Sequence, residues 1–321
     1  MSIAIHCNRC ESPAALLKGI SWDCPACDHR MAVGGGVIWA APGPPPPSSP
    51  IAERAAAVGW LEAAEEALRA RGIGPRDLMT RLNGIRTDRL GDWQFLVEPD
   101  TNGAALVLGD SWGAHVTAAS RFMRQVAVFG QDADAARFMA VRAAQEGLAN
   151  VAAVVCGRGM EDFPFRREQF DLIAVVGPWR RETSGPDEER SLDGLIRGAF
   201  RYLRKGGALV LGFPNRFGLP APHVPAPGGA RGRGLIEGTV ASSRNRLVRA
   251  GFHDPQFYLP FPDFTDYSAL VSLDSRIALR YFHGTYRHPR ARWKRVLMGA
   301  AIESGLLPLV APSYIATAKK P

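Results

Sequence analysis

The sequence of 321 residues lacks any uninterrupted run of about eighteen apolar residues, so it predicts no membrane-spanning helix. It also has few cysteines. Four of the five lie between Cys7 and Cys27, which argues against a disulfide framework spread over the chain. The first ten residues are poor in apolar side chains, so we expect no secretory leader. Together these absences favour a cytoplasmic protein.

Acidic residues are outnumbered by basic ones, 31 against 39, which gives a net charge of +8 and a pI near 9.6. Such an excess attracts anionic partners, although arginine-rich sequences often carry one without using it. Hydrophobic residues make up 46% of the chain. A chain of this length and composition has room for one sizeable domain and a small module.

The four clustered cysteines form two pairs, Cys7-x-x-Cys10 and Cys24-x-x-Cys27, separated by thirteen residues. Four thiolates brought together in this way form a tetrahedral site that suits zinc, and the closed ligand set predicts a structural metal rather than a catalytic one. We expect residues 1–40 to form a minimal zinc ribbon, with Val37–Trp39 in its small core. Two functions fit this ribbon: contact with a substrate or macromolecule, and a structural knob on the catalytic domain.

A proline-rich segment, residues 41–50, follows the ribbon and is typical of a semi-rigid linker. Residues 51–100 then predict a helical prefix. Its first helix is expected to begin at Ser49-Pro50 and to run to about Ala70. Trp93 and Phe95 near its end are expected to fill core.

The segment Ala104–Asp132 is the most informative part of the chain. Ala104–Leu108 is a short apolar run typical of a buried strand, and Gly109–Gly113 is a glycine-containing turn. Apolar residues at helical spacing follow, and a second apolar run, Val126–Phe129, leads to Asp132. Strand, turn, helix, strand and acidic residue in this order predict the nucleotide-binding half of a doubly wound sheet.

The small residues of this turn let backbone amides approach a ligand beside the positive end of a helix. Asp132, at the end of the next strand, can accept hydrogen bonds from both ribose hydroxyls of a nucleotide. The spacing alone fits NAD, FAD or S-adenosylmethionine. A strict dinucleotide fingerprint has a third glycine three positions after the second, which Trp112-Gly113 does not supply.

The sequence LVLGDSWG resembles the first motif of class I S-adenosylmethionine-dependent methyltransferases. Gly109 and Gly113 match that motif, Ser111 replaces its middle glycine, and Val107 stands where an acidic residue is usual. The run Asp132-Ala133-Asp134 is similar to the Asp-x-Ser that follows the second strand in this family.

Three later segments extend the resemblance. GMEDFPF at Gly159–Phe165 resembles the third motif, with Gly159 in place of its leading aspartate. FDLIAVVG at Phe170–Gly177 and KGGALVLGFPN at Lys205–Asn215 are similar to the fourth and fifth strands. The resemblance implies an α/β fold: a doubly wound, Rossmann-like, seven-stranded methyltransferase sheet over residues 101–321, with Ser313–Ala318 as its antiparallel last strand.

The resemblance also implies that S-adenosylmethionine is the cofactor, beside a structural zinc ion. The residues expected to bind the cofactor are Gly109, Asp110, Ser111, Gly113, Asp132, Ala133, Met160, Glu161 and Gly177.

Two motifs near the end resemble methyltransferase-like proteins of polysaccharide and natural-product gene clusters. They are Asn215–Leu219, after the fifth strand, and the aromatic and proline-rich Phe257–Phe264. Residues 214–235, which include the first of these motifs, are rich in proline and glycine, and we expect a lid or insertion there. His223 within it is a candidate general base.

Three functions fit the sequence. The first is methyl transfer to a small-molecule, glycan or natural-product acceptor. The second is an RNA or protein methyltransferase that docks through the zinc ribbon and the basic surface. The third is a non-catalytic scaffold of the same fold, which the degenerate first motif allows.

The end of the chain adds a further pattern. A basic run, Arg287–Arg295, precedes the apolar Val296–Val310. This pattern fits peripheral contact with an anionic membrane, binding of a phosphate-bearing substrate, or a helix with a solvated basic face.

Overall fold

The computed structural model describes residues 3–7, 9–13, 15–17, 21–27, 29–34, 36–40, 50–109, 112–130, 133–155, 160, 163–176, 192–218, 238–264, 266–285 and 292–321. No helix within these ranges is long and apolar enough to cross a membrane.

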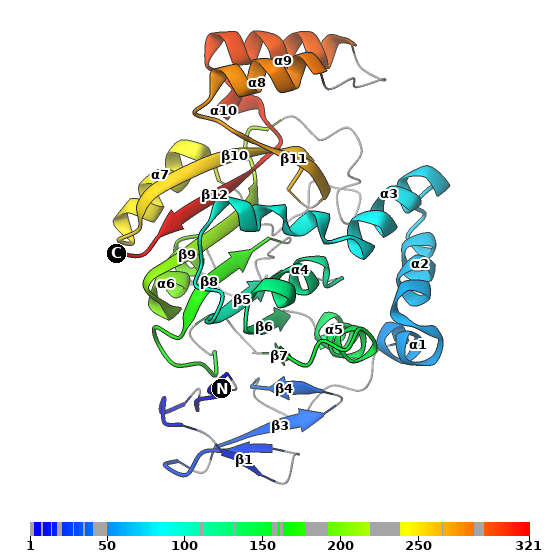
Figure 1. The fold of residues 1–321 in the computed structure, drawn as a ribbon, viewed down its shortest axis with the longest axis vertical. Helices are drawn as coiled ribbons and strands as arrows, with labels where there is room; N and C mark the ends of the chain where they lie inside the picture. Colours follow the sequence, from blue (N-terminus) through cyan, green and yellow to red (C-terminus); the bar gives the residue numbers. More distant parts are fainter. Residues whose placement is uncertain are drawn as a thin grey trace.

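A single mixed sheet runs through the molecule (Figure 1). Its centre has the order β7-β6-β5-β8-β9-β12-β10. Strands β5 to β9 are parallel, and β12 lies antiparallel between β9 and β10. The predicted seven-stranded sheet and its antiparallel last strand are therefore confirmed. The bounds of these strands are β5 Ala104–Leu108, β6 Gln125–Gly130, β7 Val151–Val155, β8 Phe170–Val175, β9 Leu203–Pro214, β10 His253–Asp263 and β12 Ser313–Lys319.

The sheet continues beyond both ends of this centre. At one end β11 (Asp266–Ser272) pairs antiparallel with β10. At the other end four N-terminal strands join it: β1 (Ala15–Leu17), β2 (Ser21–Asp23), β3 (Arg30–Gly34) and β4 (Val37–Trp39).

The junction between the N-terminal strands and the main sheet is a parallel pairing of β4 with β7, in which Val37 lies opposite Ala153 and Trp39 opposite Val155. We expected Val37–Trp39 to belong to a small core of the ribbon. Instead these residues are buried in the two hydrophobic clusters of the main sheet, Ile38 on one face and Val37 with Trp39 on the other. Pairing with β7 gives a three-residue strand a large core that the ribbon alone cannot provide.

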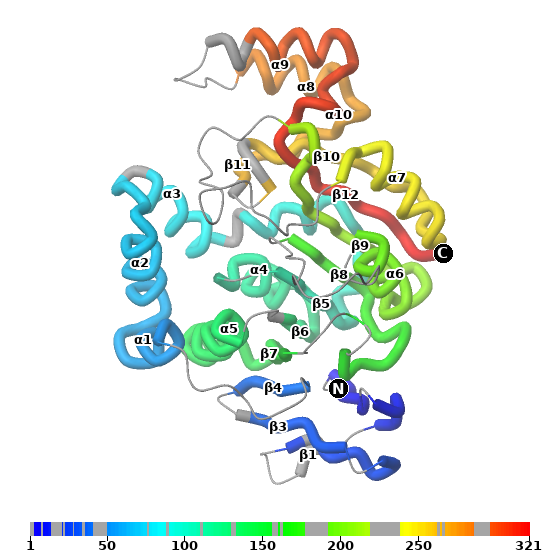
Figure 2. The backbone as a smooth tube through the Cα atoms, turned by 180° about the vertical axis from the view of Figure 1, so that it is seen from behind, coloured from blue at the N-terminus to red at the C-terminus, as the bar shows by residue number. Residues whose placement is uncertain are grey.

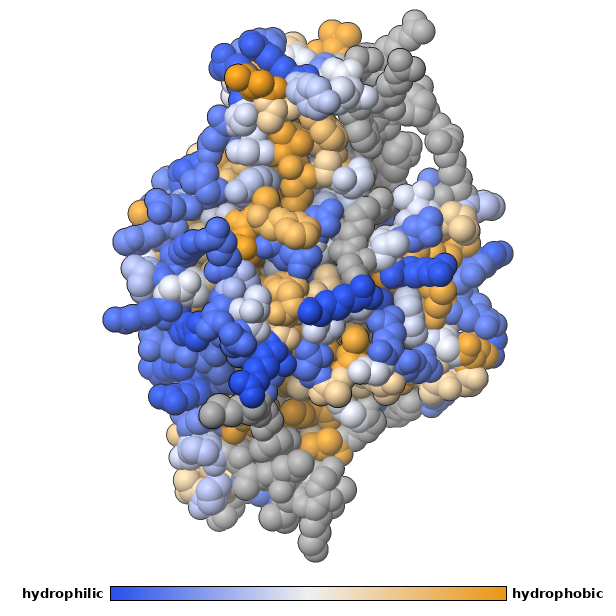
Figure 3. Space-filling model, in the orientation of Figure 1, coloured by the Kyte–Doolittle hydropathy of each residue, from blue (hydrophilic) through white to orange (hydrophobic). Residues whose placement is uncertain are grey.

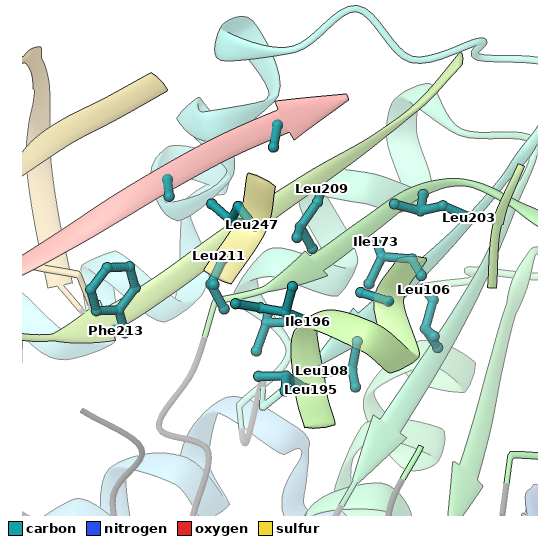
Figure 4. Packing of buried hydrophobic residues seen from close by; sticks show 14 of the residues in the cluster. Leu106, Leu108, Ile173, Leu195, Ile196, Leu203, Leu209, Leu211, Phe213 and Leu247 are labelled. Carbon is teal, nitrogen blue, oxygen red and sulfur yellow. The ribbon is translucent and has the colours of Figure 1, made fainter. Parts of the chain in front are cut away.

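Helices cover both faces of the sheet because its central strands alternate their buried side chains between two clusters. In β5, Leu106 and Leu108 belong to the cluster packed against α6 (Leu192–Tyr202) and α7 (Val240–Arg249), shown in Figure 4. Ala105 and Val107 of the same strand belong to the opposite cluster. That cluster packs against α4 (Ala114–Phe122) and α5 (Ala133–Gln145).

The first two helices of the helical prefix pack beside α5 (Figure 2), and its last two pack against α4. It comprises α1 (Pro50–Val58), α2 (Trp60–Ala70), α3 (Pro75–Arg86) and the 3-10 helix η1 (Asp88–Leu96). The single helix predicted to reach Ala70 is wrong, because Gly59 breaks it with a φ of 103°.

Of the two aromatic residues predicted to fill core near the end of the prefix, only Trp93 does so. Its indole Nε1 donates a hydrogen bond of 3.2 Å to the buried His115 Nδ1 of α4. Phe95 is 80% exposed, so the prediction for that side chain is wrong. Residues two apart on a helix do not share a face, so burying Trp93 turns Phe95 outward.

Three helices, α8 (Arg276–Thr285), α9 (Arg292–Ser304) and α10 (Leu307–Val310), stand at one end of the molecule (Figure 1). The apolar run predicted over Val296–Val310 is divided between α9 and α10 at Gly305, whose φ is 74°. The chain then enters β12 and ends beside α6.

The penultimate residue, Lys320, is 7% exposed and joins the end of the chain to α6. Its Nζ donates hydrogen bonds to the carbonyl oxygens of Phe200 (2.9 Å) and Leu203 (2.8 Å) and to Glu168 Oε1 (2.9 Å). A cation at the C-terminal end of a helix satisfies carbonyls that have no partner within the helix.

We therefore expect Lys320→Met to lower the free energy of unfolding by about 2 kcal/mol, because it removes the donor from the carbonyl oxygens of Phe200 and Leu203. The exposed neighbour gives the control, and Lys319→Met should change stability by less than about 0.5 kcal/mol. Urea unfolding of both variants measures the difference, and equal effects would contradict the assignment.

Candidate functional site

The carboxyl ends of β5 and β6 lie side by side, and each strand is followed by a helix of the same face, α4 or α5. Gly109 directly after β5 has a φ of 80°, and Gly113 directly before α4 has a φ of 86°. Ligands of open α/β sheets bind at this edge, in the loops that follow the strands. The predicted turn between β5 and α4 therefore lies where a nucleotide is expected.

Gly113 has a second reason to be glycine. A Cβ built there would lie 2.1 Å from Met139 Sδ and 3.2 Å from Arg142 Cδ, so α5 packs directly against its backbone. Any larger residue at position 113 would have to displace the Met139 side chain and adopt a strained positive φ.

Among the other residues predicted to bind the cofactor, Ala133 begins α5 and packs against the core cluster that contains Met139. Met160 is 4% exposed and lies against α6, where a Cβ on Gly198 would come within 2.7 Å of it. Six predicted site residues lie outside the described ranges: Asp110, Ser111, Asp132, Glu161, Gly177 and His223.

A buried arginine on α5 holds the turn in place. Arg142 is 1% exposed, and its Nη1 donates a hydrogen bond of 2.5 Å to the carbonyl oxygen of Trp112. Its Nη2 donates to the carbonyl oxygen of Ile85 in α3 (3.1 Å), and its Nε to Glu146 Oε1 (3.0 Å). One guanidinium thus joins the glycine turn, α3 and α5.

Aromatic contacts reinforce this junction. The Arg142 guanidinium lies 3.8 Å from the ring centre of Trp60 in α2. The Trp112 ring packs edge-on against Phe138 at 5.4 Å, and the Arg71 guanidinium lies 5.5 Å from its centre. The prefix therefore packs beside the predicted cofactor turn.

Sequence reasoning missed Arg142. One signal for it existed, because position 142 falls on the apolar stripe of α5, four residues after Phe138 and three after Met139. A basic residue on the buried face of a helix needs partners, and here they are two carbonyls and a carboxylate.

We expect Arg142→Met to lower the free energy of unfolding by about 3 kcal/mol, since the carbonyls and Glu146 lose a buried charged donor. The control is Arg69, which also forms an i, i+4 ion pair, with Glu65 in the reverse order along the helix, but is exposed. Arg69→Met should cost less than about 0.5 kcal/mol. Thermal and urea unfolding of the two variants compare them directly.

The N-terminal cysteines converge as predicted. The Sγ atoms of Cys7, Cys10, Cys24 and Cys27 all lie within 4.8 Å of one another, with Cys7–Cys27 at 3.5 Å and Cys10–Cys24 at 3.4 Å. Sulfurs about 2.3 Å from one zinc ion at tetrahedral angles lie about 3.8 Å apart, so the cluster fits this metal.

Hydrogen bonds from backbone amides to the sulfurs also fit a metal site. The backbone amides of Arg9 and Ala26 each donate to a sulfur, Cys7 Sγ and Cys24 Sγ, at 3.4 Å. Hydrogen bonding from the Ser12 side chain and amide lowers the pKa of Cys10 to about 6. Burial raises the pKa of Cys7, and against a backbone hydrogen bond from His29 the pKa of Cys27 is raised by burial and the neighbouring sulfurs. The donor set suits structural zinc and leaves no position for a substrate.

The metal cluster is tied to the segment that follows β7. The amide of His6 donates to the carbonyl oxygen of Pro164 at 2.9 Å, and Ile5 forms an antiparallel bridge with Phe165. At the other side of the same segment, β4 pairs with β7. The ribbon therefore contacts both ends of the segment 156–165, and this segment contains the predicted third motif.

We expect Cys24→Ser to lose bound zinc and to lower the midpoint of thermal unfolding, because zinc contributes roughly 10 kcal/mol of apparent binding free energy to modules of this size. Cys156→Ser, which changes the cysteine outside the cluster, should keep the metal. Zinc content by atomic emission and tryptophan fluorescence on heating measure both effects. Full zinc content in Cys24→Ser would contradict the site.

The two motifs near the end of the chain have structural roles. The Nδ2 atom of Asn215, which is 6% exposed, donates to the carbonyl oxygens of Leu309 (3.1 Å) and Ala311 (2.8 Å). Gly218 lies so close to this junction that a Cβ on it would be 2.3 Å from the Ala311 carbonyl oxygen. The first motif thus fastens the end of β9 to α10 and to the start of β12.

The second motif forms β10. Phe257 and Leu259 are buried in the main core, and Phe261 packs on Phe282 of α8 with ring centres 4.5 Å apart. Phe264 covers Gly212 of β9, where a Cβ would lie 2.6 Å from its ring. These contacts explain the aromatic residues without any ligand.

No protein-family model and no curated protein matches the sequence. Among solved structures, the Haemonchus contortus phosphoethanolamine N-methyltransferase 2, in complex with phosphomonomethylethanolamine and S-adenosylhomocysteine, is similar with a TM-score of 0.46 and 16% identity. The similarity covers 73% of this chain and 52% of that one, so the chain spans about half the length of that enzyme.

Two further structures align over more of their length. A geranyl diphosphate methyltransferase in complex with S-adenosylmethionine is 19% identical, with a TM-score of 0.44 over 82% of this chain and 91% of that one. A Thermotoga maritima S-adenosylmethionine-dependent methyltransferase, described as a possible histamine N-methyltransferase, is 14% identical. Its TM-score is 0.46, over 82% of this chain and 100% of that one.

The strand order decides the fold. Counted along the chain from β5 to β12, leaving β11 aside, the central strands have the spatial order 3-2-1-4-5-7-6, with the seventh antiparallel. This is the class I S-adenosylmethionine-dependent methyltransferase fold. The N-terminal four-cysteine cluster is an addition to it.

Proposed function

We propose that the chain is an S-adenosylmethionine-dependent methyltransferase with a small-molecule, glycan or natural-product acceptor. The observation that supports the proposal is the turn between β5 and α4, which begins and ends on glycines of positive φ at the carboxyl edge of the sheet. Asp132 follows the neighbouring strand β6 in the sequence, as ribose recognition requires. We also propose a cytoplasmic location.

The cofactor supplies an electrophilic methyl group on a sulfonium, which passes to a nucleophilic atom of the acceptor while the sulfur keeps the electron pair of the broken bond. The protein aligns the two reactants and excludes water. Arg142 contributes by fixing the Trp112 carbonyl and hence the end of the glycine turn. The acceptor's proton leaves to solvent or to a side chain, for which His223 is the candidate from the sequence.

The zinc ribbon has a structural part in this proposal. It adds strands to the β7 edge and holds the chain before and after the third motif. We therefore favour the structural knob over a docking arm for RNA or protein.

Asp132→Asn tests the proposal. Loss of a charge-assisted hydrogen bond to the ribose should raise the dissociation constant for S-adenosylmethionine at least about tenfold, measured by isothermal titration calorimetry. Asp134→Asn, two residues further on in the first turn of α5, is the control and should change the constant by less than about twofold.

Two results would contradict the proposal. Equal affinity of wild type and Asp132→Asn would remove the assigned ribose contact. No heat of binding to the wild-type protein at millimolar cofactor would leave the non-catalytic scaffold.

A further inference from the structure

The helices α8, α9 and α10 carry an unusual concentration of exposed apolar side chains. Ten large hydrophobic residues are exposed on the described surface, and six of them lie within residues 277–309. We call these six the hairpin surface. Figure 3 shows apolar residues beside hydrophilic ones at this end of the molecule. The hairpin surface consists of Ile277 (80% exposed), Tyr281 (74%), Val296 (71%), Leu297 (48%), Leu306 (52%) and Leu309 (49%).

These side chains are not the ones that attach the helices to the domain. Attachment is by other residues, such as Leu279 and Ile302, which are buried in the main core, and Phe282, which packs on Phe261. Ile277 and Tyr281 are four residues apart, so they share one side of α8. Both side chains are largely exposed in the part of the chain that the structure describes, so packing within that part does not explain their apolar character.

The helices α8 and α9, which together we call the hairpin, are also held in one geometry. Arg280 of α8 forms a two-pronged ion pair with Glu303 of α9, with Nε 2.7 Å from Oε1. Gly299 allows close packing of the two helices, because a Cβ there would lie 3.0 Å from the His283 ring. A fixed apolar surface loses little conformational entropy when a partner covers it.

The charge of the same helices points to the kind of partner. They carry five basic residues and one acidic residue, Glu303, which is paired with Arg280. Two more arginines, Arg287 and Arg290, lie between α8 and α9 in the sequence. The five basic residues are Arg276, Arg280, Arg292, Lys294 and Arg295. The hairpin is therefore both apolar and strongly cationic.

We propose that the hairpin surface binds the surface of an anionic lipid bilayer. Aliphatic side chains enter the boundary between head groups and acyl chains, and lysine and arginine residues of the same helices attract anionic head groups. Single-stranded RNA fits less well, because its bases stack on aromatic side chains and five of the six residues are aliphatic. A second copy of the chain would bring two cationic hairpins together.

This contact has a defined position relative to the sheet. Asn215, at the carboxyl end of β9, donates to the carbonyl oxygen of Leu309 in α10. Since β9, β8 and β5 are parallel, the hairpin stands at the same edge of the sheet as the glycine turn. Lipid binding does not depend on methyl transfer, so the two proposals can fail separately.

Sedimentation with lipid vesicles tests the inference. The wild-type protein should bind vesicles of phosphatidylcholine and phosphatidylglycerol, and binding to phosphatidylcholine alone should be much weaker. Lys294→Gln with Arg295→Gln should weaken binding to the anionic vesicles about thirtyfold. Ile277→Ser should weaken it about tenfold through lost burial of apolar area.

Matched controls keep the result specific. Phe95→Ser changes a side chain that is as exposed as Ile277, at 80%, but lies in the prefix, and Lys319→Gln removes an exposed charge outside the hairpin. Neither should change vesicle binding, and circular dichroism should show an unchanged fold in every variant.

Several outcomes would overturn the inference. Equal binding to neutral and anionic vesicles would, and so would equal losses in Ile277→Ser and Phe95→Ser. Absence of vesicle binding would also overturn it. In that case, binding of single-stranded RNA that is lost in Lys294→Gln with Arg295→Gln would indicate an RNA surface. Conversion of a dimer into a monomer by Ile277→Ser would indicate contact with a second copy of the chain.

Discussion

The buried guanidinium of Arg142 is the interaction on which the predicted cofactor end of this fold depends. The turn Gly109–Gly113 begins and ends on glycines, whose backbone no side chain restricts, so contacts with neighbouring residues help to fix its conformation. Arg142 of α5 donates a hydrogen bond to the carbonyl oxygen of Trp112 in the turn. Its other nitrogens donate to the carbonyl oxygen of Ile85 in α3 and to the carboxylate of Glu146 on its own helix. Gly113 completes the junction, because the Met139 side chain of α5 occupies the space that a Cβ at this position would take.

The consequence is that the helical prefix belongs to the site even though it precedes the sheet in the chain. Trp60 lies over the guanidinium and Ile85 accepts one of its hydrogen bonds. A disturbance of α2 or α3 therefore reaches the turn through one residue. The degenerate first motif, with Ser111 in place of a glycine, is held by packing from outside the motif.

Much of the fold could be predicted from the sequence because the parallel strands contain short apolar runs, such as Ala104–Leu108, Val126–Phe129 and Val151–Val155. The zinc cluster followed from spacing alone, since two Cys-x-x-Cys pairs leave few other arrangements. What could not be predicted depends on contacts between distant segments. Nothing in Val37–Trp39 says that it pairs with a strand more than a hundred residues later, because parallel pairing leaves no local signature.

The residues at the site divide in the same way. Gly109 and Gly113 were visible from the motif, and the structure gives each a positive φ. Arg142 resembled any basic residue on a helix until its partners were known. Asn215 was noticed through a resemblance, but its role as a tether of α10 required the structure.

The pairing of β4 with β7 has a consequence for how the molecule is assembled during synthesis. The four cysteines of the ribbon emerge from the ribosome well before Val151–Val155. Zinc can therefore bind and fold the ribbon before most of the sheet has been synthesised. In this intermediate, β4 is an edge strand of the ribbon, and its outer amides and carbonyls stay unpaired until β7 has been synthesised. If no zinc binds at that stage, the ribbon is disordered when the sheet forms. The exposed edge of β7 is then free to pair with another molecule.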